Sequence, residues 1–281
     1  MLNNFAFFGT DDFAVKILAG LKPTGVLPKL IVTTPDQPQG RHLTLTPPPV
    51  KVWAVENKIE FLQPEKLKEF NLPVCEVAIV ASYGKILPTT LLTQPKNGFV
   101  NIHPSLLPKY RGATPLQSAI LSDDTETGVT LMQVDEQMDH GAIIAQEKLA
   151  LITQTFLELR DETAKIGVKL ILEKLPLWLA GKLKAIPQAD ALATYTKKIK
   201  KEDGLLKEDD SPEINFRKIR AYTPWPGVYF FQANKRVIIK KARLVKPAGQ
   251  AHLQGDELVI ERIVPEGRVE MAYADFLKGT I

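Results

Sequence analysis

The chain has 281 residues, which suffices for two domains because single domains usually stop growing before this size. Apolar residues make up 44% and charged residues 24%, the net charge is +4, and no run of about eighteen uncharged apolar residues occurs, which excludes a disordered or membrane-spanning protein. The single cysteine, Cys75, excludes an internal disulfide, and no Cys/His pair has the spacing of zinc ligands, so we expect no metal. The N-terminal residues carry acids where a signal peptide needs a basic start, which predicts a cytoplasmic protein.

The first third of the chain alternates short apolar runs with helical patterns. Continuous apolar runs bounded by turn residues fit buried parallel strands, and patterns with a period near 3.6 residues fit crossover helices. We therefore predict an α/β domain with an open, doubly wound parallel sheet. The apolar runs lie at residues 4–9, 29–34, 74–84 and 98–103, and the helical patterns at 11–21 and 87–92.

The turn Gly9-Thr10-Asp11-Asp12 follows the first apolar run, where a dinucleotide-binding fingerprint would lie. The second and third glycines of that fingerprint are missing, and two acids stand there instead. Carboxylates stabilise a helix N-terminus but repel a phosphate. The turn therefore predicts a helix cap and excludes a nucleotide site.

The last third differs in pattern from the first. An amphipathic stretch at 157–183, broken by Pro176 and closed by Gly181, predicts the last helix of the α/β domain. The polar, charged residues that follow are typical of an interdomain linker. Short strand-like runs between turn residues then predict a smaller, antiparallel β barrel or open sheet. The expected boundaries are 1–189 for the α/β domain, 190–208 for the linker and 209–281 for the C-terminal domain.

Positive charge gathers near the C-terminus. From Thr196 onward the chain has 17 Lys+Arg and 12 Asp+Glu, whereas residues 1–195 have 19 and 20. Residues 231–246 contain six basic residues and no acid among strand-forming Val and Ile. A basic sheet face of this kind suits phosphates, although a merely solvated strand face has the same pattern.

Asn101 and His103 stand at the end of the apolar run 98–103. In an open α/β sheet ligands bind beyond the carboxyl ends of the strands. Residues i and i+2 of a strand face the same side, so the amide and the imidazole should project together while Ile102 enters the core. An amide and an imidazole can donate hydrogen bonds to a carbonyl group that becomes tetrahedral, and these bonds stabilise the negative charge that its oxygen gains. A capping Asn and a hydrogen-bonded His at a turn explain this segment equally well.

A third candidate lies in the turn between the strand-like runs VTLMQV and AIIAQ. Asp139 could orient an imidazole, hold it protonated or move a proton through water, and Asp135 and His140 compete for these roles. Residue spacing alone does not choose among these three side chains. Ser105 lacks the setting of an activated nucleophile, so the residues suggest direct transfer to an incoming nucleophile.

The run NIHPSLLPKYRG at 101–112, followed by the segment 124–146, resembles the 10-formyltetrahydrofolate-dependent formyltransferases. Coverage is nearly end to end. The elements PDQPQGR, PPPVK and PWPG point, within this family, to the members that act on tRNA. The other supporting stretches are FFGTDDFAVKIL, VASYGKILP, YTKKIKKEDG and IRAYTPWPG.

The resemblance implies roles for particular residues. It makes Asn101, His103 and Asp139 the catalytic residues, and so chooses Asp139 over Asp135. It also implies a Rossmann-like first domain and an OB-like C-terminal barrel, with Ser105 to Gly112 shaping the cleft and Arg111 as a structural anchor. The implied site for 10-formyltetrahydrofolate, the formyl donor, comprises Ser82, Tyr83, Gly84, Ile86, Leu87, Pro88, Ser105, Leu106, Leu107 and Pro108.

The acceptor implied by the resemblance is the free α-amine of initiator methionyl-tRNA, bound by a monomeric enzyme. Arg41 matches the family position that meets the tRNA acceptor end, although His42-Leu43-Thr44-Leu45 follows it where lysines are common. Formyltransferases for small amines, such as glycinamide ribonucleotide or an amino sugar nucleotide, and a formyltetrahydrofolate hydrolase would share the three catalytic residues but leave the basic domain without a role. A nonenzymatic RNA-binding protein would not need them. The expected tRNA contacts are Arg41, Lys235, Arg236, Lys240 and Lys241.

Overall fold

The computed structural model describes the whole chain except residues 1, 41–42, 208, 246–255 and 279–281. The chain divides into two compact units, and each is described by itself. The larger unit comprises residues 1–115, 126–150 and 160–196, and the smaller one residues 116–125, 151–159 and 197–281.

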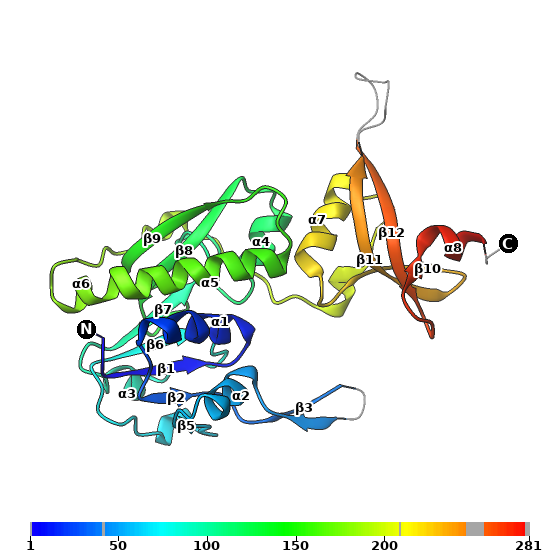
Figure 1. Ribbon diagram of the computed structural model, residues 1–281. Helices are drawn as coiled ribbons and strands as arrows, with labels where there is room; N and C mark the ends of the chain where they lie inside the picture. Colours follow the sequence, from blue (N-terminus) through cyan, green and yellow to red (C-terminus); the bar gives the residue numbers. More distant parts are fainter. Residues whose placement is uncertain (1, 41–42, 208, 246–255, 279–281) are drawn as a thin grey trace. The chain divides into compact units, whose positions relative to one another are not determined.

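A seven-stranded sheet runs through the larger unit in the order β5-β2-β1-β6-β7-β8-β9 (Figure 1). Neighbouring strands from β5 to β7 are parallel, whereas β8 pairs antiparallel with both β7 and β9. The bounds are Phe5–Gly9 for β1, Leu30–Val32 for β2, Phe61–Leu62 for β5, Val77–Ala81 for β6, Phe99–His103 for β7, Glu126–Gln133 for β8 and Ile143–Ala150 for β9.

The predicted doubly wound α/β sheet is confirmed, and β8 and β9 add an antiparallel edge to its parallel strands. Residues 134–142 join β8 to β9 without a crossover, and consecutive strands joined in this way pair antiparallel. The side chains of β9 largely alternate between more and less buried positions, as expected for a strand with one face in water. The strand order reverses between β1 and β6, so the crevice where such sheets bind ligands lies at the carboxyl ends of these strands.

Two apolar layers cover the faces of this sheet. Alternate residues of β1 take opposite sides: Phe5 and Phe7 belong to the core under the helices α1, α2 and α5, whereas Ala6 and Phe8 belong to the core on the other face. The helices span Asp12–Leu21 (α1), Pro49–Glu56 (α2), Thr89–Leu92 (α3), Phe156–Glu173 (α5) and Leu175–Leu179 (α6), with short 3-10 turns at Lys22–Thr24, Leu67–Glu69 and Asp190–Leu192 and a two-stranded ribbon of β3 (Gln37–Gln39) and β4 (Thr44–Thr46).

The helix cap expected at the first turn is present. Oδ1 of Asp11 accepts hydrogen bonds from the backbone N–H groups of Phe13 and Ala14 at 3.0 and 3.3 Å. These groups have no partner within the helix, so the aspartate fixes where α1 begins. The cap also holds the chain at the carboxyl end of β1, beside the strand-order reversal.

The smaller unit contains a four-stranded antiparallel sheet, which confirms the expected second β domain. One face of this sheet packs against α7, and Val228, Val237, Ile239 and Ile263 are buried. Its elements are α4 (Pro115–Leu121), a 3-10 turn at Lys201–Gly204, α7 (Pro212–Tyr222), β10 (Val228–Gln232), β11 (Lys235–Val245), β12 (Glu257–Pro265), β13 (Met271–Ala272) and α8 (Tyr273–Lys278).

Candidate active site

Strand β7 carries Asn101 and His103 to its carboxyl end, as its alternation predicts. Ile102 between them is 1% exposed and belongs to the core under α1 and α5. His103 is buried and Asn101 half-buried, on the opposite face. The strand ends at His103, where Pro104 removes a backbone donor and turns the chain into the loop 104–114.

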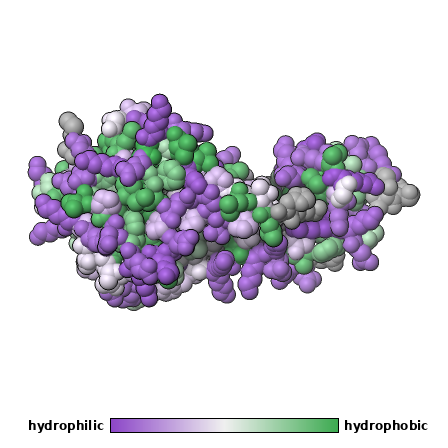
Figure 2. Space-filling model, turned by 90° about the horizontal axis from the view of Figure 1, so that it is seen from below, coloured by the Kyte–Doolittle hydropathy of each residue, from purple (hydrophilic) through white to green (hydrophobic). Residues whose placement is uncertain are grey.

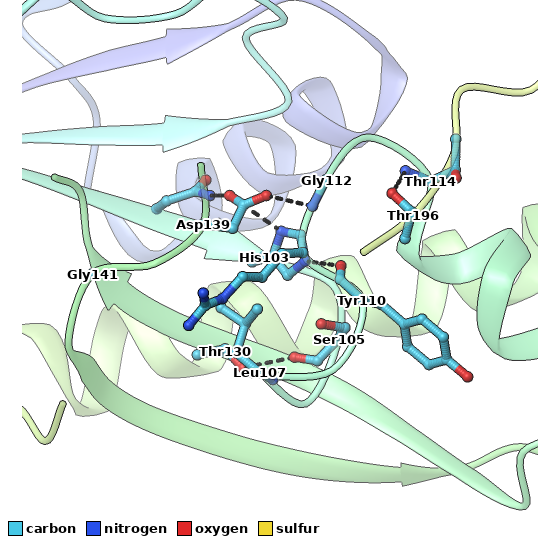
Figure 3. A network of polar contacts seen from close by, with 12 residues as sticks. His103, Ser105, Leu107, Tyr110, Gly112, Thr114, Thr130, Asp139, Gly141 and Thr196 are labelled. Atoms are coloured by element: carbon cyan, nitrogen blue, oxygen red, sulfur yellow. Dashed lines mark hydrogen bonds and ion pairs between the residues drawn. The ribbon is translucent and has the colours of Figure 1, made fainter. Parts of the chain in front are cut away.

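Asp139 lies beside His103 in the turn between β8 and β9 (Figure 3), and it also contacts Asn101. Its Oδ1 accepts a hydrogen bond from Nδ2 of Asn101 at 3.3 Å and lies 3.7 Å from Nδ1 of His103. Its Oδ2 accepts the backbone N–H of Gly112 at 2.7 Å. The structure therefore brings an amide, an imidazole and a carboxylate together at one end of the sheet.

The orientation of His103 follows from its second partner. Nε2 of the ring lies 2.9 Å from the carbonyl oxygen of Tyr110. A carbonyl oxygen can only accept, so Nε2 carries a proton and donates it. Nδ1 is thus the ring nitrogen that faces Asp139.

The turn that presents Asp139 is tightly packed. Asp139 has φ of +50°, a left-handed conformation that costs free energy for a residue with a side chain. At Gly141 a Cβ atom would lie 2.0 Å from the carbonyl oxygen of Gln133 and 2.8 Å from its carbon. Only glycine fits there, so the return of the chain into β9 depends on the absence of a side chain.

The loop after β7 is held by its own hydrogen bonds. The hydroxyl of Ser105, which is fully buried, donates to the carbonyl oxygen of Lys109 at 2.7 Å. Thr130 on β8 donates to the carbonyl oxygen of Ser105 at 2.6 Å and accepts from the N–H of Leu107 at 3.1 Å. Nε2 of Gln146 adds bonds of 2.8 Å to Thr130 and to the Leu107 carbonyl. The hydroxyl of Ser105 therefore serves the shape of the loop.

The segment 82–88 follows β6 at the strand-order reversal. Ser82 and Gly84 have φ of +48° and +78°, and Ser82 donates a 2.6 Å hydrogen bond to Oδ2 of Asp11. Tyr83 is 2% exposed and stacks edge-on against Phe8, and burial raises the pKa of its hydroxyl to about 12. The side chain of Tyr83 thus belongs to the core, and only its backbone is available to a ligand.

Ile86 in the same segment points the other way, because its side chain is 90% exposed. It borders a cavity with a volume of about 340 Å³. Two lysines on its rim give the cavity a positive edge. The lining residues are Glu65, Leu67, Lys68, Lys85, Ile86 and Pro88.

Arg111 anchors a polar network that sequence reasoning largely missed. Its side chain is 2% exposed, with Nη2 2.7 Å from Oδ1 of Asp190 and Nη1 3.2 Å from the hydroxyl of Tyr195. Its Nε and Nη2 both donate to Oε1 of Gln188, at 3.1 and 2.8 Å. The bond to Arg111 lowers the pKa of Asp190. Polar composition assigned Asp190 and Tyr195 to a linker, and no local signal separates them from a solvated segment.

His140 and Asp135, the two competitors of Asp139, pair with each other instead. Nδ1 of His140 lies 2.6 Å from Oδ2 of Asp135, and Nε2 lies 3.4 Å from Oδ2 of Asp190. The hydrogen bond to Asp135 raises the pKa of His140. These side chains therefore belong to the network around Arg111.

The basic residues expected to contact tRNA lie on β11 of the smaller unit, except Arg41, which is outside the described residues. Lys235, Lys240 and Lys241 are exposed, and Nζ of Lys241 lies 2.9 Å from Oε2 of Glu261. Arg236 stacks with its guanidinium carbon 3.9 Å from the centre of the Tyr229 ring. Hydrophilic side chains cover most of this unit on the face drawn in Figure 2.

Within the ranges described, no group of three or more His, Cys, Asp or Glu side chains could hold a metal ion. Among the helices of the described part of the chain, none has the length and apolar character needed to cross a membrane.

Comparison with known proteins finds matches to both parts of the chain. Residues 3–175 match the model of the formyl transferase family, and residues 198–280 match that of the formyl transferase C-terminal domain. A methionyl-tRNA formyltransferase of Chloroflexus aurantiacus is 42% identical over 86% of this chain and 81% of its own length. A methionyl-tRNA formyltransferase of Myxococcus xanthus is 37% identical over 97% of this chain and 94% of its own.

The fold also resembles that of a solved structure. HypX from Aquifex aeolicus, crystallised in complex with tetrahydrofolic acid, matches with a TM-score of 0.67 and 18% identity. The match covers 99% of this chain but only 47% of HypX, so the chain spans about half the length of that protein.

Proposed function

Because the chain belongs to the formyl transferase family, we propose that it transfers the formyl group of 10-formyltetrahydrofolate to the free α-amino group of initiator methionyl-tRNA, giving N-formylmethionyl-tRNA for translation initiation. Identities of 42% and 37% to methionyl-tRNA formyltransferases, over most of both chains, support this acceptor. The observation that carries the proposal is the convergence of Asn101, His103 and Asp139 at the carboxyl end of β7.

In the proposed reaction the amine nitrogen attacks the formyl carbon. A bond forms between these atoms, the bond from the formyl carbon to N10 of the folate breaks, and the amine proton passes to N10. The formyl oxygen carries negative charge at the tetrahedral stage, and fixed donors aimed at it lower the barrier by roughly 3 kcal/mol each. Asn101 and His103 are the proposed donors.

The hydrogen bonds of these two residues limit how they can act. Asn101 uses one N–H of Nδ2 on Asp139, which leaves the second N–H for the formyl oxygen. His103 uses Nε2 on the Tyr110 carbonyl, so donation to the substrate has to come from Nδ1. The ring then carries protons on both nitrogens at that stage.

Asp139 is proposed to accept the amine proton, directly or through water, and to help pass it to N10. Its two oxygens already accept from Asn101 and Gly112, at 3.3 and 2.7 Å. Each carboxylate oxygen has a further acceptor position, so the carboxylate can take a proton while these bonds orient it.

The folate is proposed to lie along Ser82 to Pro88 and the loop Ser105 to Pro108. Backbone groups of the first segment, where Ser82 and Gly84 turn with positive φ, suit the pterin edge, and the exposed Ile86 suits an aromatic part of the ligand. In the loop, burial of Ser105 and Leu107 leaves the backbone as the proposed contact.

The tRNA is proposed to contact Arg41 and the basic side chains Lys235, Arg236, Lys240 and Lys241. The exposure of the three lysines supports contacts to phosphates. We further propose a cytoplasmic monomer, with a catalytic domain over 1–189, a linker over 190–208 and a tRNA-binding domain over 209–281.

The test is incubation of the purified protein with 10-formyltetrahydrofolate and methionyl-tRNA, scored as N-formylmethionyl-tRNA, with the His103→Ala variant as control. The proposal expects product from the unmutated protein and a loss of at least about two orders of magnitude in the variant. Product from a small amine but none from methionyl-tRNA would overturn it. A steep fall of tRNA binding between low and moderate salt is the second expected result, because phosphate contacts release counterions.

A further inference from the structure

One side chain outside β7 and the β8–β9 turn holds the backbone that presents Asp139. Nε2 of Gln188 donates to the carbonyl oxygen of Asp139 at 2.8 Å and to that of Gly141 at 2.9 Å. These two bonds use both hydrogens of the amide nitrogen. They therefore fix the carbonyls on either side of His140 relative to one side chain.

Gln188 is itself held from two directions. Ile186, two residues earlier, exchanges backbone hydrogen bonds of 2.8 Å with Ile143 at the start of β9. Oε1 of Gln188 accepts two bonds from the buried guanidinium of Arg111. The amide thus stands between a fixed backbone and a fixed cation.

The two ends of this amide cannot exchange places. An arginine has donors only and a carbonyl oxygen accepts only, so the oxygen of Gln188 must face Arg111 and its nitrogen must face the turn. A residue with only acceptors at this position would keep the contact to Arg111 and lose both contacts to the turn. Such a substitution therefore tests the support of Asp139 by itself, because the contact that holds the loop at Arg111 is kept.

The contacts close a ring around the proposed catalytic carboxylate. The N–H of Gly112 donates to Oδ2 of Asp139, and the neighbouring Arg111 bonds to Gln188, which bonds back to the Asp139 carbonyl. Both the side chain and the main chain of Asp139 are therefore tied to the same short loop. Displacement of a reacting group by about 1 Å can cost on the order of 100-fold in rate.

From this ring we infer that Gln188 is a positioning residue for Asp139, which acts on the chemical step and not on substrate binding. The inference rests on the proposed function only in that Asp139 takes part in the transfer. Gln188 lies outside the segments proposed to bind the folate and the tRNA, so its removal should lower kcat and leave KM in place.

The test compares Gln188→Glu with the matched change Gln94→Glu. Gln94 likewise donates from its amide nitrogen to two backbone carbonyls, those of Phe70 and Thr90, while its oxygen accepts from the N–H of Leu72. We expect Gln188→Glu to lower kcat by about 10- to 100-fold, with KM for both substrates within about twofold and Tm within about 3 °C. We expect Gln94→Glu to leave kcat unchanged, whatever its effect on Tm.

An unchanged kcat in folded Gln188→Glu, or an equal loss of kcat in both variants, would overturn the inference. Should Gln188→Glu fail to fold, Gln188→Asn takes its place, since it keeps both polar groups one methylene short of the turn. Its kcat should fall while binding of 10-formyltetrahydrofolate, measured by calorimetry, is kept, and an undiminished kcat would again overturn the inference. Failure of the proposed function shows differently, as absence of N-formylmethionyl-tRNA from the unmutated protein, and the comparison of variants then uses whichever amine is formylated.

Discussion

The side-chain amide of Asn101 donates a 3.3 Å hydrogen bond to the carboxylate of Asp139, although 38 residues separate them. Asn101 lies near the carboxyl end of a buried strand, and Asp139 lies in a turn with positive φ. The bond leaves Asn101 one N–H to donate and orients the Asp139 carboxylate beside His103. Asn101, the proposed donor to the formyl oxygen, and Asp139, the proposed proton acceptor, are thereby fixed relative to each other.

The two carboxylates of the β8–β9 turn should differ sharply in their effect on rate. We expect Asp139→Asn to lower kcat/KM by at least about 100-fold, because it removes the proton acceptor and leaves one oxygen where two accept from Asn101 and Gly112. Asp135→Asn should cost less than about threefold, since Asp135 contacts His140 and not Asn101 or His103. Steady-state kinetics with methionyl-tRNA checks both. A loss in Asp139→Asn of less than about tenfold would contradict the assignment.

Gly141→Ala should damage both stability and rate. Its new Cβ would stand 2.0 Å from the carbonyl oxygen of Gln133, so the backbone has to move and carry Asp139 with it. Gly181→Ala is the control, because φ there is +71° but nothing lies within 4 Å of the added Cβ. That control should lose about 1 kcal/mol of stability and keep its kcat. Thermal unfolding and kinetics of the two variants separate steric displacement from backbone strain, and equal kcat values would rule out the displacement.

The sequence predicts one half of this site and leaves the other open for physical reasons. Strand alternation is local, so it correctly predicts that Asn101 and His103 share a face and that Ile102 enters the core. The choice between Asp135 and Asp139 depends on the positive φ of Asp139 and on the fit of Gly141 against Gln133, which are tertiary features. Only the family resemblance selected Asp139.

The network around Arg111 was beyond sequence reasoning for a similar reason. Gln188, Asp190 and Tyr195 lie in polar, irregular chain whose composition equally fits solvent-exposed linker. Their contacts arise because Ile186 pairs with Ile143 and Arg111 pairs with the chain near Tyr195, over separations of 43 and 84 residues. The direction of the two edge strands is not assigned by the sequence, because a buried apolar run does not reveal strand direction.

The pairing of His140 predicts a pH dependence of stability. The hydrogen bond to Asp135 raises the pKa of His140 above its ordinary 6.5, despite partial burial, and the charges of Asp135 and Asp190 add to this. Because the pKa of His140 is raised in the folded state, its pairing contributes fully to stability below the unfolded-state pKa. This contribution is lost as pH rises through the folded-state pKa. The Tm deficit of His140→Gln should therefore be larger at about pH 6 than at about pH 9. In an Asp135→Asn background the deficit should depend much less on pH, and a deficit that grows with pH would contradict the pairing.

The lysines of β11 should contribute unequally to tRNA binding. Lys241 is held by Glu261 at 2.9 Å, whereas no ion pair of Lys240 is found within the part of the chain described. We expect Lys240→Ala to reduce the slope of log K against log salt by about one, and Lys241→Ala to reduce it by less, because Lys241 must first leave its partner. Binding titrations of tRNA at several salt concentrations measure the slopes. Unchanged slopes in both variants would show that this face of β11 does not contact the tRNA.

Ile86 provides a test of the folate segment that does not touch the chemistry. Its side chain is 90% exposed, so Ile86→Ala should leave Tm unchanged, yet covering that side chain with a ligand contributes about 1–2 kcal/mol. We therefore expect KM for 10-formyltetrahydrofolate to rise about 5- to 30-fold at constant KM for tRNA. Val74→Ala is the matched control, because Val74 is 94% exposed and lies before β6, away from the carboxyl ends of the strands. If the folate KM of Ile86→Ala equals that of Val74→Ala, the donor does not lie along this segment, and the site must be sought along the loop Ser105 to Pro108 alone.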